Sequence, residues 1–562
     1  MSRRNLKLSI VLLFVLSIGA RAQAPAPKVA DDTTGTISGQ VVSDSGQPLA
    51  GASLFVRAIN SVNAPRSTTA DADGNFRLNG LEPALYVITA MAPAYATDSN
   101  PTPTYYRLGD SVRLELVRGG VITGTVTNSA GEPVIGVRVR VVRIRDAKGQ
   151  TSRQPSFGGD RQTDDRGVYR IYGLLPGTYL ISAGGGGSFT AVFNPYDTDI
   201  PTYSPSSTRD NASEITVRSG EEITADIRYR GEPGYSISGT VKITGTSGAS
   251  VTLRSVGNPV LLGSAFQQAG IGRGFAFNGL ADGEYTLRAQ EIVSSISTDL
   301  SQLATSVTRR ITIKGASVSG VELVPTPLAA IKGRVLLVPL KVAECQGKRA
   351  PLFAEMMVQL QRPEKEIEDE DGIYVGPIGG SAGPDANGSL VWRNVRPGKY
   401  RFEPRFYARY WYLQSITTKT AGPKAQTVDA AANWTGVKAG EQLSNVTITL
   451  AEGAASIRGR VAVAEGAVVQ PGTNLYLVPA ELDKGTDVLR FFVTEVGTDG
   501  TFTLNNLPPG KYLALTNVEP PVKLRDPEAA AARAKLLRTA ATKKTEIELK
   551  PCQNLTDYQL KQ

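Results

Sequence analysis

The sequence of 562 residues predicts an all-β protein built as a tandem array of about five β-sandwiches, and three observations support this prediction. The length corresponds to several domains, since a domain has about 100–200 residues. A strand motif of the form Ile-x-Gly-x-Val occurs five times along the chain. A second motif, made of a turn, an alternating strand and another turn, follows the first motif in each copy.

The first motif is a short alternating strand with glycine at its centre. Successive copies are separated by 85, 115, 94 and 126 residues, counted between Gly39, Gly124, Gly239, Gly333 and Gly459. Spacings of this size fit one sandwich per copy, because a sandwich of about seven strands takes roughly 100 residues.

The second motif joins two turns through a strand with period-two alternation. In the first copy it is Asp73-Gly74-Asn75-Phe76-Arg77-Leu78, followed by Leu81-Glu82-Pro83-Ala84-Leu85-Tyr86. Asp-Gly and Asn-Gly supply the positive φ angles that hairpin turns need, and the alternation directs Phe and Leu to one face of a sheet. The third copy is degenerate, with Gly274-Phe275-Ala276-Phe277 in place of the motif. We therefore expect about seven short strands in each unit.

A pair of short strands around a polar turn closes the later units. In the last unit Cys552 takes the turn position where the other copies have glycine, so we expect it in an exposed turn. An Ala-rich stretch that begins with Asp526-Pro527-Glu528 predicts one helix, with Asp526 as a favourable N-cap. The predicted organisation is a signal peptide (1–22), a flexible leader (23–34) and sandwiches at 35–118, 119–231, 232–326 (degenerate), 327–452 and 453–562, the last with a helical insertion at 526–541.

These motifs resemble the carboxypeptidase regulatory-like domain. The likeness also includes a Gly-x-Pro element in the first two units, at Gly46 to Ala52 and Gly131 to Val137, which the third unit lacks. The resemblance implies a transthyretin-like (prealbumin-like) seven-strand sandwich in each unit, a fold grouped with carbohydrate-binding-like folds. The chain also resembles long secreted bacterial proteins that carry tandem copies. The peptidase that such modules accompany has no room in this chain, so the resemblance implies no peptidase activity.

The N-terminus predicts export. A basic segment, an apolar run of about 13 residues and a small-x-small site are typical of a secretory signal peptide, and the run is too short to span a bilayer. Removal of this segment leaves 57 basic and 52 acidic residues, so the net charge falls from +9 to +5. Because these charges are interspersed, we expect no nucleic-acid partner. The expected location is the periplasm, the cell surface or the extracellular space, with no membrane span after cleavage.

The chain contains no histidine and only two cysteines. A histidine general base, a Ser-His-Asp triad and the usual zinc and iron–sulfur sites are thereby excluded. Four residues have the spacing of a calcium loop, but a phenylalanine stands where that loop needs glycine, so we favour a plain turn at Asp71, Asp73, Asn75 and Glu82. We expect no catalytic residues, no cofactor and no metal.

Two aromatic clusters are candidate ligand-binding surfaces, because sugar rings stack on exposed aromatic side chains. The first places aromatic side chains on both faces of a predicted strand, so that one face is a candidate for exposure, and it comprises Tyr407, Tyr410, Trp411 and Tyr412. The second lies in a long loop rich in Gly and Pro and comprises Phe189, Phe193, Tyr196 and Tyr203. Packing in a core or between domains is the favoured alternative for both clusters.

The two cysteines, Cys345 and Cys552, are far apart in the sequence. Export permits a disulfide between them, and free thiols are the alternative, since pairing depends on their geometry.

These observations favour a non-catalytic exported scaffold that binds a carbohydrate or a cell-surface protein. One alternative is an accessory or assembly component for a partner peptidase or an outer-membrane system. A second alternative is an enzyme that uses carboxylates alone, which would need two carboxyl groups about 5–10 Å apart in one cleft. The sequence leaves the ligand and the oligomeric state open.

Overall fold

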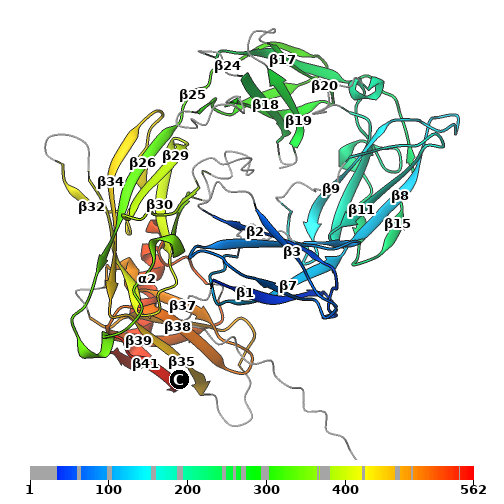
Figure 1. Ribbon diagram of the computed structural model, residues 1–562. Coiled ribbons are helices and arrows are strands. Elements are labelled where there is room, and N and C mark those ends of the chain that lie inside the picture. Colours follow the sequence, from blue (N-terminus) through cyan, green and yellow to red (C-terminus); the bar gives the residue numbers. More distant parts are fainter. Residues whose placement is uncertain are drawn as a thin grey trace, which may run out of the picture.

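The computed structural model describes residues 35–561, apart from 60–64, 98–103, 153–159, 186–193, 244–247, 257–260, 268–273, 293–302, 364–365, 367–379, 420–424, 463–468, 482–484, 520 and 544. The described residues form ten sheets, which pair as five sandwiches in chain order, and they contain one α-helix, near the C-terminus (Figure 1). The predicted fold class is confirmed. The predicted signal peptide and leader lie outside the described residues.

The first sandwich pairs the sheet β4-β1-β7-β6 with the sheet β3-β2-β5. Its strands are β1 (Ile37–Ser43), β2 (Ser53–Ala58), β3 (Arg66–Thr69), β4 (Asn75–Leu78), β5 (Tyr86–Met91), β6 (Tyr95–Ala96) and β7 (Ser111–Arg118). The second sandwich pairs β11-β8-β15, with β16 beside β8, and β10-β9-β12-β13, with β14 beside β12. Its elements are β8 (Gly120–Thr127), β9 (Arg138–Asp146), β10 (Arg161–Gln162), β11 (Val168–Leu174), β12 (Gly177–Ala183), β13 (Thr202–Tyr203), β14 (Ile215–Val217), β15 (Glu222–Thr224), β16 (Ile227–Arg228) and the 3₁₀ turns η1 (Pro195–Thr198) and η2 (Arg209–Asn211).

The third sandwich pairs β20-β17-β24 with β19-β18-β21-β22-β25, and β23 lies beside β21. Its strands are β17 (Tyr235–Val241), β18 (Gly248–Ser255), β19 (Leu261–Gln267), β20 (Gly274–Leu280), β21 (Gly283–Ile292), β22 (Ala304–Thr305), β23 (Arg309–Ile313), β24 (Val318–Leu323) and β25 (Thr326–Pro327). The degenerate unit therefore keeps the sandwich architecture of the others.

The fourth sandwich pairs β29-β26-β34-β31-β32 with β28-β27-β30-β33. Its elements are β26 (Ala329–Val338), η3 (Ala343–Cys345), η4 (Phe353–Glu355), β27 (Met357–Gln361), β28 (Ser381–Ala382), β29 (Ser389–Val395), β30 (Gly398–Arg405), β31 (Trp411–Lys419), β32 (Thr427–Asp429), β33 (Thr435–Val437) and β34 (Gln442–Glu452). The fifth sandwich pairs β38-β35-β41 with β37-β36-β39-β40. Its elements are β35 (Ala455–Ala462), β36 (Asn474–Pro479), η6 (Val488–Arg490), β37 (Phe492–Glu495), β38 (Thr501–Leu507), β39 (Gly510–Asn517), η7 (Pro527–Ala529), α2 (Ala530–Lys543), β40 (Glu546–Leu549) and β41 (Asn554–Lys561).

All five sandwiches share one topology. The strand that carries Ile-x-Gly-x-Val lies antiparallel to the strand of the second motif and parallel to the last long strand of its unit, as β1 does between β4 and β7. The isoleucine and the valine of each motif strand are buried, or nearly so, in the core of their own sandwich. Because residues i, i+2 and i+4 share one face of a strand, the motif glycine faces the same core.

The motif glycine is required because the neighbouring strand approaches it too closely for a side chain. A Cβ atom would lie 1.8–2.8 Å from a carbonyl oxygen of the parallel strand in all five copies, at Gly39, Gly124, Gly239, Gly333 and Gly459. In the first and third sandwiches the aromatic ring of the second motif, from Phe76 or Phe275, also lies within 3 Å of that Cβ position. The two motifs are therefore structurally linked. Because the motif glycine has no side chain, the aromatic ring of the second motif can pack against it.

We expect Gly239→Ala to destabilise the third sandwich by about 1–3 kcal/mol, the usual cost of forcing extra volume into a packed core. The new methyl group would meet the Val321 carbonyl oxygen at 1.8 Å, and both groups belong to backbone that cannot rotate away. Gly274→Ala is a matched control in the strand paired with β17, because its Cβ would have only an ordinary contact at 3.5 Å. Hydrogen exchange of the β17 amides should accelerate in the first variant alone, and equal exchange in both variants would contradict the packing argument.

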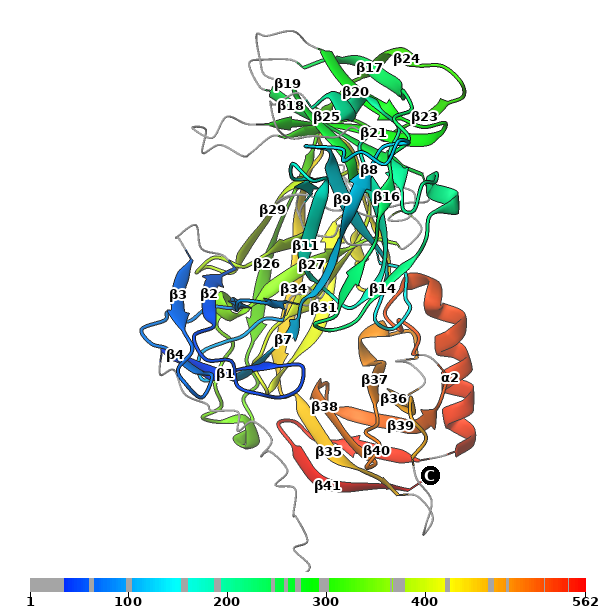
Figure 2. The same ribbon diagram turned by 90° about the vertical axis from the view of Figure 1, so that its right-hand side faces the viewer.

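The five sandwiches curl back on themselves, so that the first lies beside the fourth (Figures 1 and 2). Residues 302 positions apart meet there, where the Tyr407 hydroxyl donates to the Tyr105 carbonyl oxygen at 3.3 Å. The fifth sandwich extends from the fourth, and α2 covers one of its sheets by packing Leu536 and Ala540 onto Tyr476 and Leu515. No helix among the described residues is long and apolar enough to cross a membrane.

The junctions between sandwiches use one repeated position near the end of the second-motif strand, which is a β-bulge in the second to fifth sandwiches. Its residue has φ between 56° and 75° in every copy and is Gly80, Gly173, Gly279, Asn394 or Asn506. In the second and third sandwiches the bulge glycine packs backbone to backbone on the glycine of the incoming linker. In the fourth and fifth sandwiches the asparagine side chain instead forms hydrogen bonds with the preceding sandwich, so a single position joins successive domains.

Candidate functional site

A large cavity lies between the fourth and fifth sandwiches. It has a volume of about 1110 Å³ and is lined by the end of β27, β30 and Trp434 on one side and by β37 and the segment before α2 on the other. Two smaller hollows of about 390 and 30 Å³ lie beside it, and Arg525 lines all three. Clefts at domain interfaces are common sites of ligand binding, so this cleft is the candidate functional site.

The start of the helical insertion closes one end of the cleft. The Asp526 carboxylate pairs with the Arg401 guanidinium of β30, and the Glu528 carboxylate accepts a hydrogen bond of 2.6 Å from the Trp434 indole. Asp526 occupies the N-cap position of η7, as predicted, but its side chain makes no capping hydrogen bond. The predicted capping role is therefore wrong, because this carboxylate is used between domains instead.

Arg525 lies in a turn whose backbone is held by hydrogen bonds on both sides. The guanidinium of Arg533, on the first turns of α2, donates to the carbonyl oxygens of Leu524 and Asp526 at 2.7 and 2.8 Å. The Leu524 side chain is buried beneath α2, and the Asp526 amide donates to the Lys523 carbonyl oxygen. The residues on both sides of Arg525 are thus fixed, which positions its side chain toward the cleft.

The Arg525 guanidinium has no hydrogen bond or ion pair with any residue that the structure describes. It lies over the Phe492 ring, with 5.9 Å between the guanidinium carbon and the ring centroid. Burial lowers the pKa of Arg525, and the negative charge of Glu403 opposes that shift. Arginine nevertheless stays protonated in proteins, so the cleft contains a cation whose hydrogen-bonding capacity is unused.

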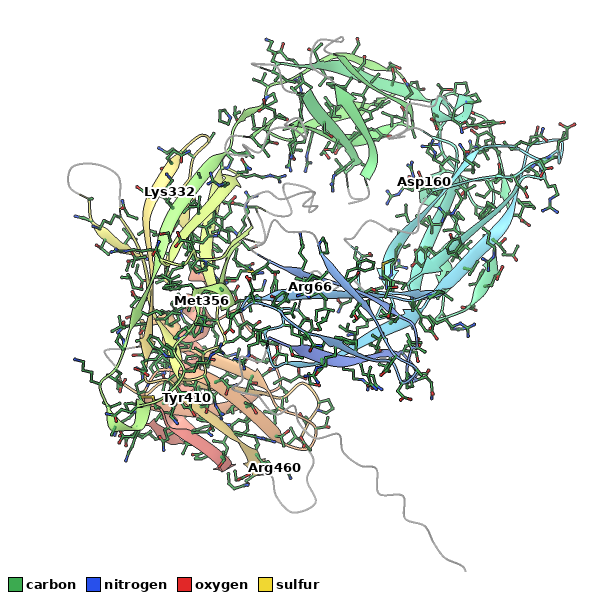
Figure 3. The ribbon with its side chains drawn as sticks, viewed as in Figure 1. Arg66, Asp160, Lys332, Met356, Tyr410 and Arg460 are labelled. Atoms are coloured by element: carbon green, nitrogen blue, oxygen red, sulfur yellow. A yellow bond between two sulfur atoms is a disulfide. The ribbon has the colours of Figure 1, made fainter. Side chains whose placement is uncertain are left out.

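The first predicted aromatic cluster does not line the cleft itself and does not form an open aromatic surface. Trp411 is 3% exposed and belongs to the core of the fourth sandwich, which excludes stacking of a sugar on its face. Tyr407 is half-buried and lines the hollow of 390 Å³ together with Arg525. Tyr410 lies where the fourth sandwich meets the fifth (Figure 3), and burial raises the pKa of Tyr412, which is also half-buried.

The second predicted cluster is not brought together with the first. Tyr196 packs edge-on against Tyr229 at 5.6 Å on the core of the second sandwich. Tyr203 forms part of the short edge strand β13, and burial raises its pKa. Phe189 and Phe193 lie outside the described residues. The calcium-loop spacing forms a turn, in which the Asp71 carboxylate accepts two backbone N–H bonds, and no group that could hold a metal is found among the described residues.

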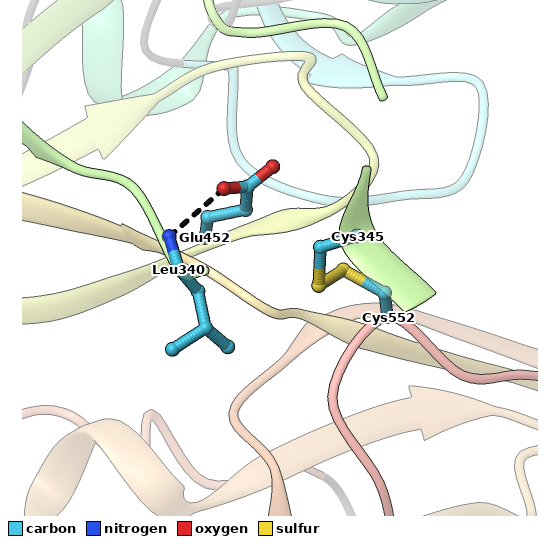
Figure 4. Close-up of a disulfide and its surroundings, with 4 residues drawn as sticks. All are labelled: Leu340, Cys345, Glu452 and Cys552. Carbon is cyan, nitrogen blue, oxygen red and sulfur yellow. Dashed lines mark hydrogen bonds between the residues drawn. A yellow bond between two sulfur atoms is a disulfide. The ribbon is translucent and has the colours of Figure 1, made fainter. Parts of the chain in front are cut away.

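A disulfide also joins the two sandwiches (Figure 4). Cys345, from η3 of the fourth sandwich, is joined to Cys552, from the turn between β40 and β41 of the fifth. Cys552 has the predicted turn-glycine conformation, with φ of 56°, but it is only 7% exposed, so its predicted exposure is wrong. Next to it the amide of Leu340 donates to the carboxylate of Glu452, the last residue of β34, at 2.9 Å.

Two features of this region were missed by sequence reasoning. Arg525 belongs to no sequence motif. It lies in a cleft only because the fourth sandwich packs opposite it. Asn394 and Asn506 had a usable signal, since they stand where three other copies have glycine. A residue that tolerates positive φ and also carries hydrogen-bonding groups is typical of a position that contacts a neighbour.

We expect Asn506→Asp to weaken the contact between the fourth and fifth sandwiches by about 1–3 kcal/mol. The Asn506 amide donates to the carbonyl oxygens of Ala408 and Trp411 at 2.8 and 2.7 Å, and a carboxylate there would face both oxygens without a proton to donate. Asn506→Gly keeps the positive φ without the added charge and should cost less. Cleavage of the linker near Gly453 by a protease measures the effect, and equal rates in all three proteins would refute the assigned role.

Comparison with known proteins gives one family match. Residues 36–115 match the family model of the carboxypeptidase regulatory-like domain. No curated protein matches the chain.

Three solved structures illustrate the similarity to other chains. The TIE protein of Bacillus anthracis has 15% identity and a TM-score of 0.15, with 52% of this chain and 50% of that chain covered, so the match spans half of that protein. The minor pilin GBS52 of Streptococcus agalactiae has 13% identity and a TM-score of 0.20, with coverage of 35% and 95%. Two B repeat units of the collagen-binding protein of Staphylococcus aureus have 12% identity and a TM-score of 0.13, with coverage of 74% and 99%.

Proposed function

We propose that this chain, whose residues 36–115 are a carboxypeptidase regulatory-like domain, is a non-catalytic exported scaffold that binds a glycan or a cell-surface protein. The observation that carries this proposal is the locked contact between the fourth and fifth sandwiches, which encloses a cleft of about 1110 Å³. The disulfide, the Asn506 hydrogen bonds and the Arg401–Asp526 pair fix the two domains at separate points around it. Such bracing fits a preformed binding site, because a rigid site loses little conformational entropy when its ligand binds.

The absence of histidine supports the non-catalytic part of the proposal. The feature of the array that suits a binding role is its arrangement. Contacts at the repeated bulge position hold the sandwiches, with their loops and clefts, at fixed positions. Loops and interfaces on a rigid framework are the usual place for binding residues in β-sandwich proteins.

The test is a binding screen of the secreted chain against cell-wall polysaccharides, a glycan array and intact cells. We expect retention on at least one glycan or cell surface with no release of cleavage products, and recovery of the chain from the periplasm or the medium. Stoichiometric co-purification with a peptidase or an outer-membrane component, without glycan binding, would favour the accessory role instead. Release of sugar products would establish an enzyme and overturn the proposal.

A further inference from the structure

Among the charged groups that line the cleft, one guanidinium and one carboxylate have no partner among the described residues, and the same holds for the exposed ammonium group of Lys399. The lining includes five cationic side chains and four carboxylates. Three of the carboxylates have partners within the cleft wall: Glu366 pairs with Arg362, Asp526 with Arg401, and Glu528 with the Trp434 indole. Arg525 and Glu403 form no ion pair or hydrogen bond with the residues that the structure describes.

Arg525 and Glu403 act on each other electrostatically, but their charged nitrogen and oxygen atoms lie more than 4.0 Å apart and form no ion pair. They stand on opposite walls, Glu403 on β30 of the fourth sandwich and Arg525 on the turn before α2 of the fifth. A charge held half-buried without a partner is costly unless a ligand completes its hydrogen bonds. The pair is therefore suited to a ligand that offers a carboxylate to one wall and hydroxyl donors to the other.

We infer that this cleft binds a uronic-acid-bearing glycan, with its carboxylate on the Arg525 guanidinium and its hydroxyl groups donating to Glu403. This inference rests on the proposed function and names the ligand class for it. A guanidinium recognises a carboxylate with two parallel hydrogen bonds, which a neutral sugar cannot match. The aromatic residues Trp434 and Phe492 add apolar surface of the kind that sugar rings contact.

The remaining charges favour this glycan over an acidic peptide. A uronate unit carries one negative charge together with several hydroxyl donors, which matches one available guanidinium among carboxylate acceptors. A run of Asp or Glu side chains would place further carboxylates beside Glu403, which has no cationic partner among the described residues, and like charges at close range disfavour binding. The volume of about 1110 Å³ lies just above the range of roughly 300–1,000 Å³ that is usual for pockets of small ligands. A cleft of this size has room for a ligand of several sugar units.

The test uses the full secreted chain and titrates a trisaccharide of two galactose units and one galacturonic acid unit, with the neutral galactose trisaccharide and a penta-glutamate peptide as comparison ligands. Calorimetry gives the affinity, and the fluorescence of Trp434 gives a second readout because this side chain lines the cleft. We expect binding of the uronate trisaccharide, and at least about tenfold weaker binding of the neutral one, the ratio expected for one charged hydrogen-bonded pair.

Two substitutions decide the inference. Arg525→Gln should weaken uronate binding by about tenfold or more, and Arg525→Lys should restore part of it, since lysine keeps the charge but loses the paired geometry. Arg460→Gln is the matched control, because Arg460 is exposed on the outer edge of the fifth sandwich, away from the cleft (Figure 3). It should leave the affinity unchanged, and all variants should keep the thermal transition of the wild type.

The outcomes separate this inference from the proposed function. Equal affinity for the charged and neutral trisaccharides, or binding that Arg525→Gln leaves intact, would overturn the uronate site and leave glycan binding standing elsewhere on the chain. Tighter binding of penta-glutamate would assign the cleft to a peptide and overturn the glycan class. Failure to bind any sugar in the calorimeter, while the polysaccharide screen remains positive, would also refute the cleft as the site.

Discussion

Replacing Trp411 with alanine is expected to destabilise the fourth sandwich by about 3–5 kcal/mol, the range measured for removal of a large aromatic side chain from a core. Trp411 is 3% exposed and packs in the largest hydrophobic cluster among the described residues, together with Trp392, Ile416 and Leu450. Alanine would leave a cavity that the two sheets cannot close, because their spacing is set by the other residues of the core. The effect of this substitution should therefore appear as lost stability.

Intrinsic fluorescence makes the measurement local. The chain has three tryptophans, Trp392, Trp411 and Trp434, and all of them lie in the fourth sandwich. A denaturant titration followed by tryptophan emission therefore reports this domain within the full-length chain. The midpoint should fall in the alanine variant, and the slope of the transition should stay that of the wild type if only stability changes.

Two further variants separate packing from binding. Trp411→Phe should cost less, because it keeps an aromatic ring and because the Trp411 indole N–H has no hydrogen-bond partner to lose among the described residues. Trp434→Ala removes a half-buried side chain at the cleft and should leave the core transition near that of the wild type. A Trp411→Ala protein with unchanged stability and lost glycan binding would reverse this assignment and make the residue a ligand contact.

The repeated parts of the fold were predictable because each rests on local chemistry. The glycine of Ile-x-Gly-x-Val recurs because a carbonyl oxygen of the parallel strand lies within 2.8 Å of its Cβ position in every sandwich. The third unit lacks several of the motif residues but retains Ile237, Gly239 and Phe275. These three residues are enough to identify the antiparallel pair of β17 and β20. These packing constraints act between neighbouring strands of one sandwich. The sequence of a single unit is therefore enough to predict them.

The candidate site was not predictable, because it depends on how separate domains meet. Nothing near Tyr407 in the sequence indicates contact with Tyr105, 302 residues away. The segment around Trp411 has aromatics at successive positions, so alternation could not decide which of them face the core. Arg525 has the flanking sequence of an ordinary helix entry, and its role appears only when Phe492 and Glu403 are placed beside it.

Removal of the disulfide through the double variant Cys345→Ser/Cys552→Ser is expected to destabilise the joined fourth and fifth sandwiches by about 2–5 kcal/mol. The bond links residues 207 positions apart, and a cross-link over a long loop restricts the unfolded chain strongly. The two cysteines also lie beside the linker, where the Cys552 amide donates to the Gly453 carbonyl oxygen at 3.0 Å. Loss of the bond should therefore loosen the hinge between the two domains as well as lower their stability.

Calorimetry of the full chain measures this effect, with the first three sandwiches as internal references because the disulfide does not touch them. We expect the transitions of the fourth and fifth sandwiches to move to lower temperature and the others to stay in place. Reductant should reproduce the shift in the wild type and have no effect on the double variant. If reductant moves neither protein, the contacts of Asn506 and Arg401 hold the two domains without the bond. If it moves both equally, the shift does not come from Cys345 and Cys552.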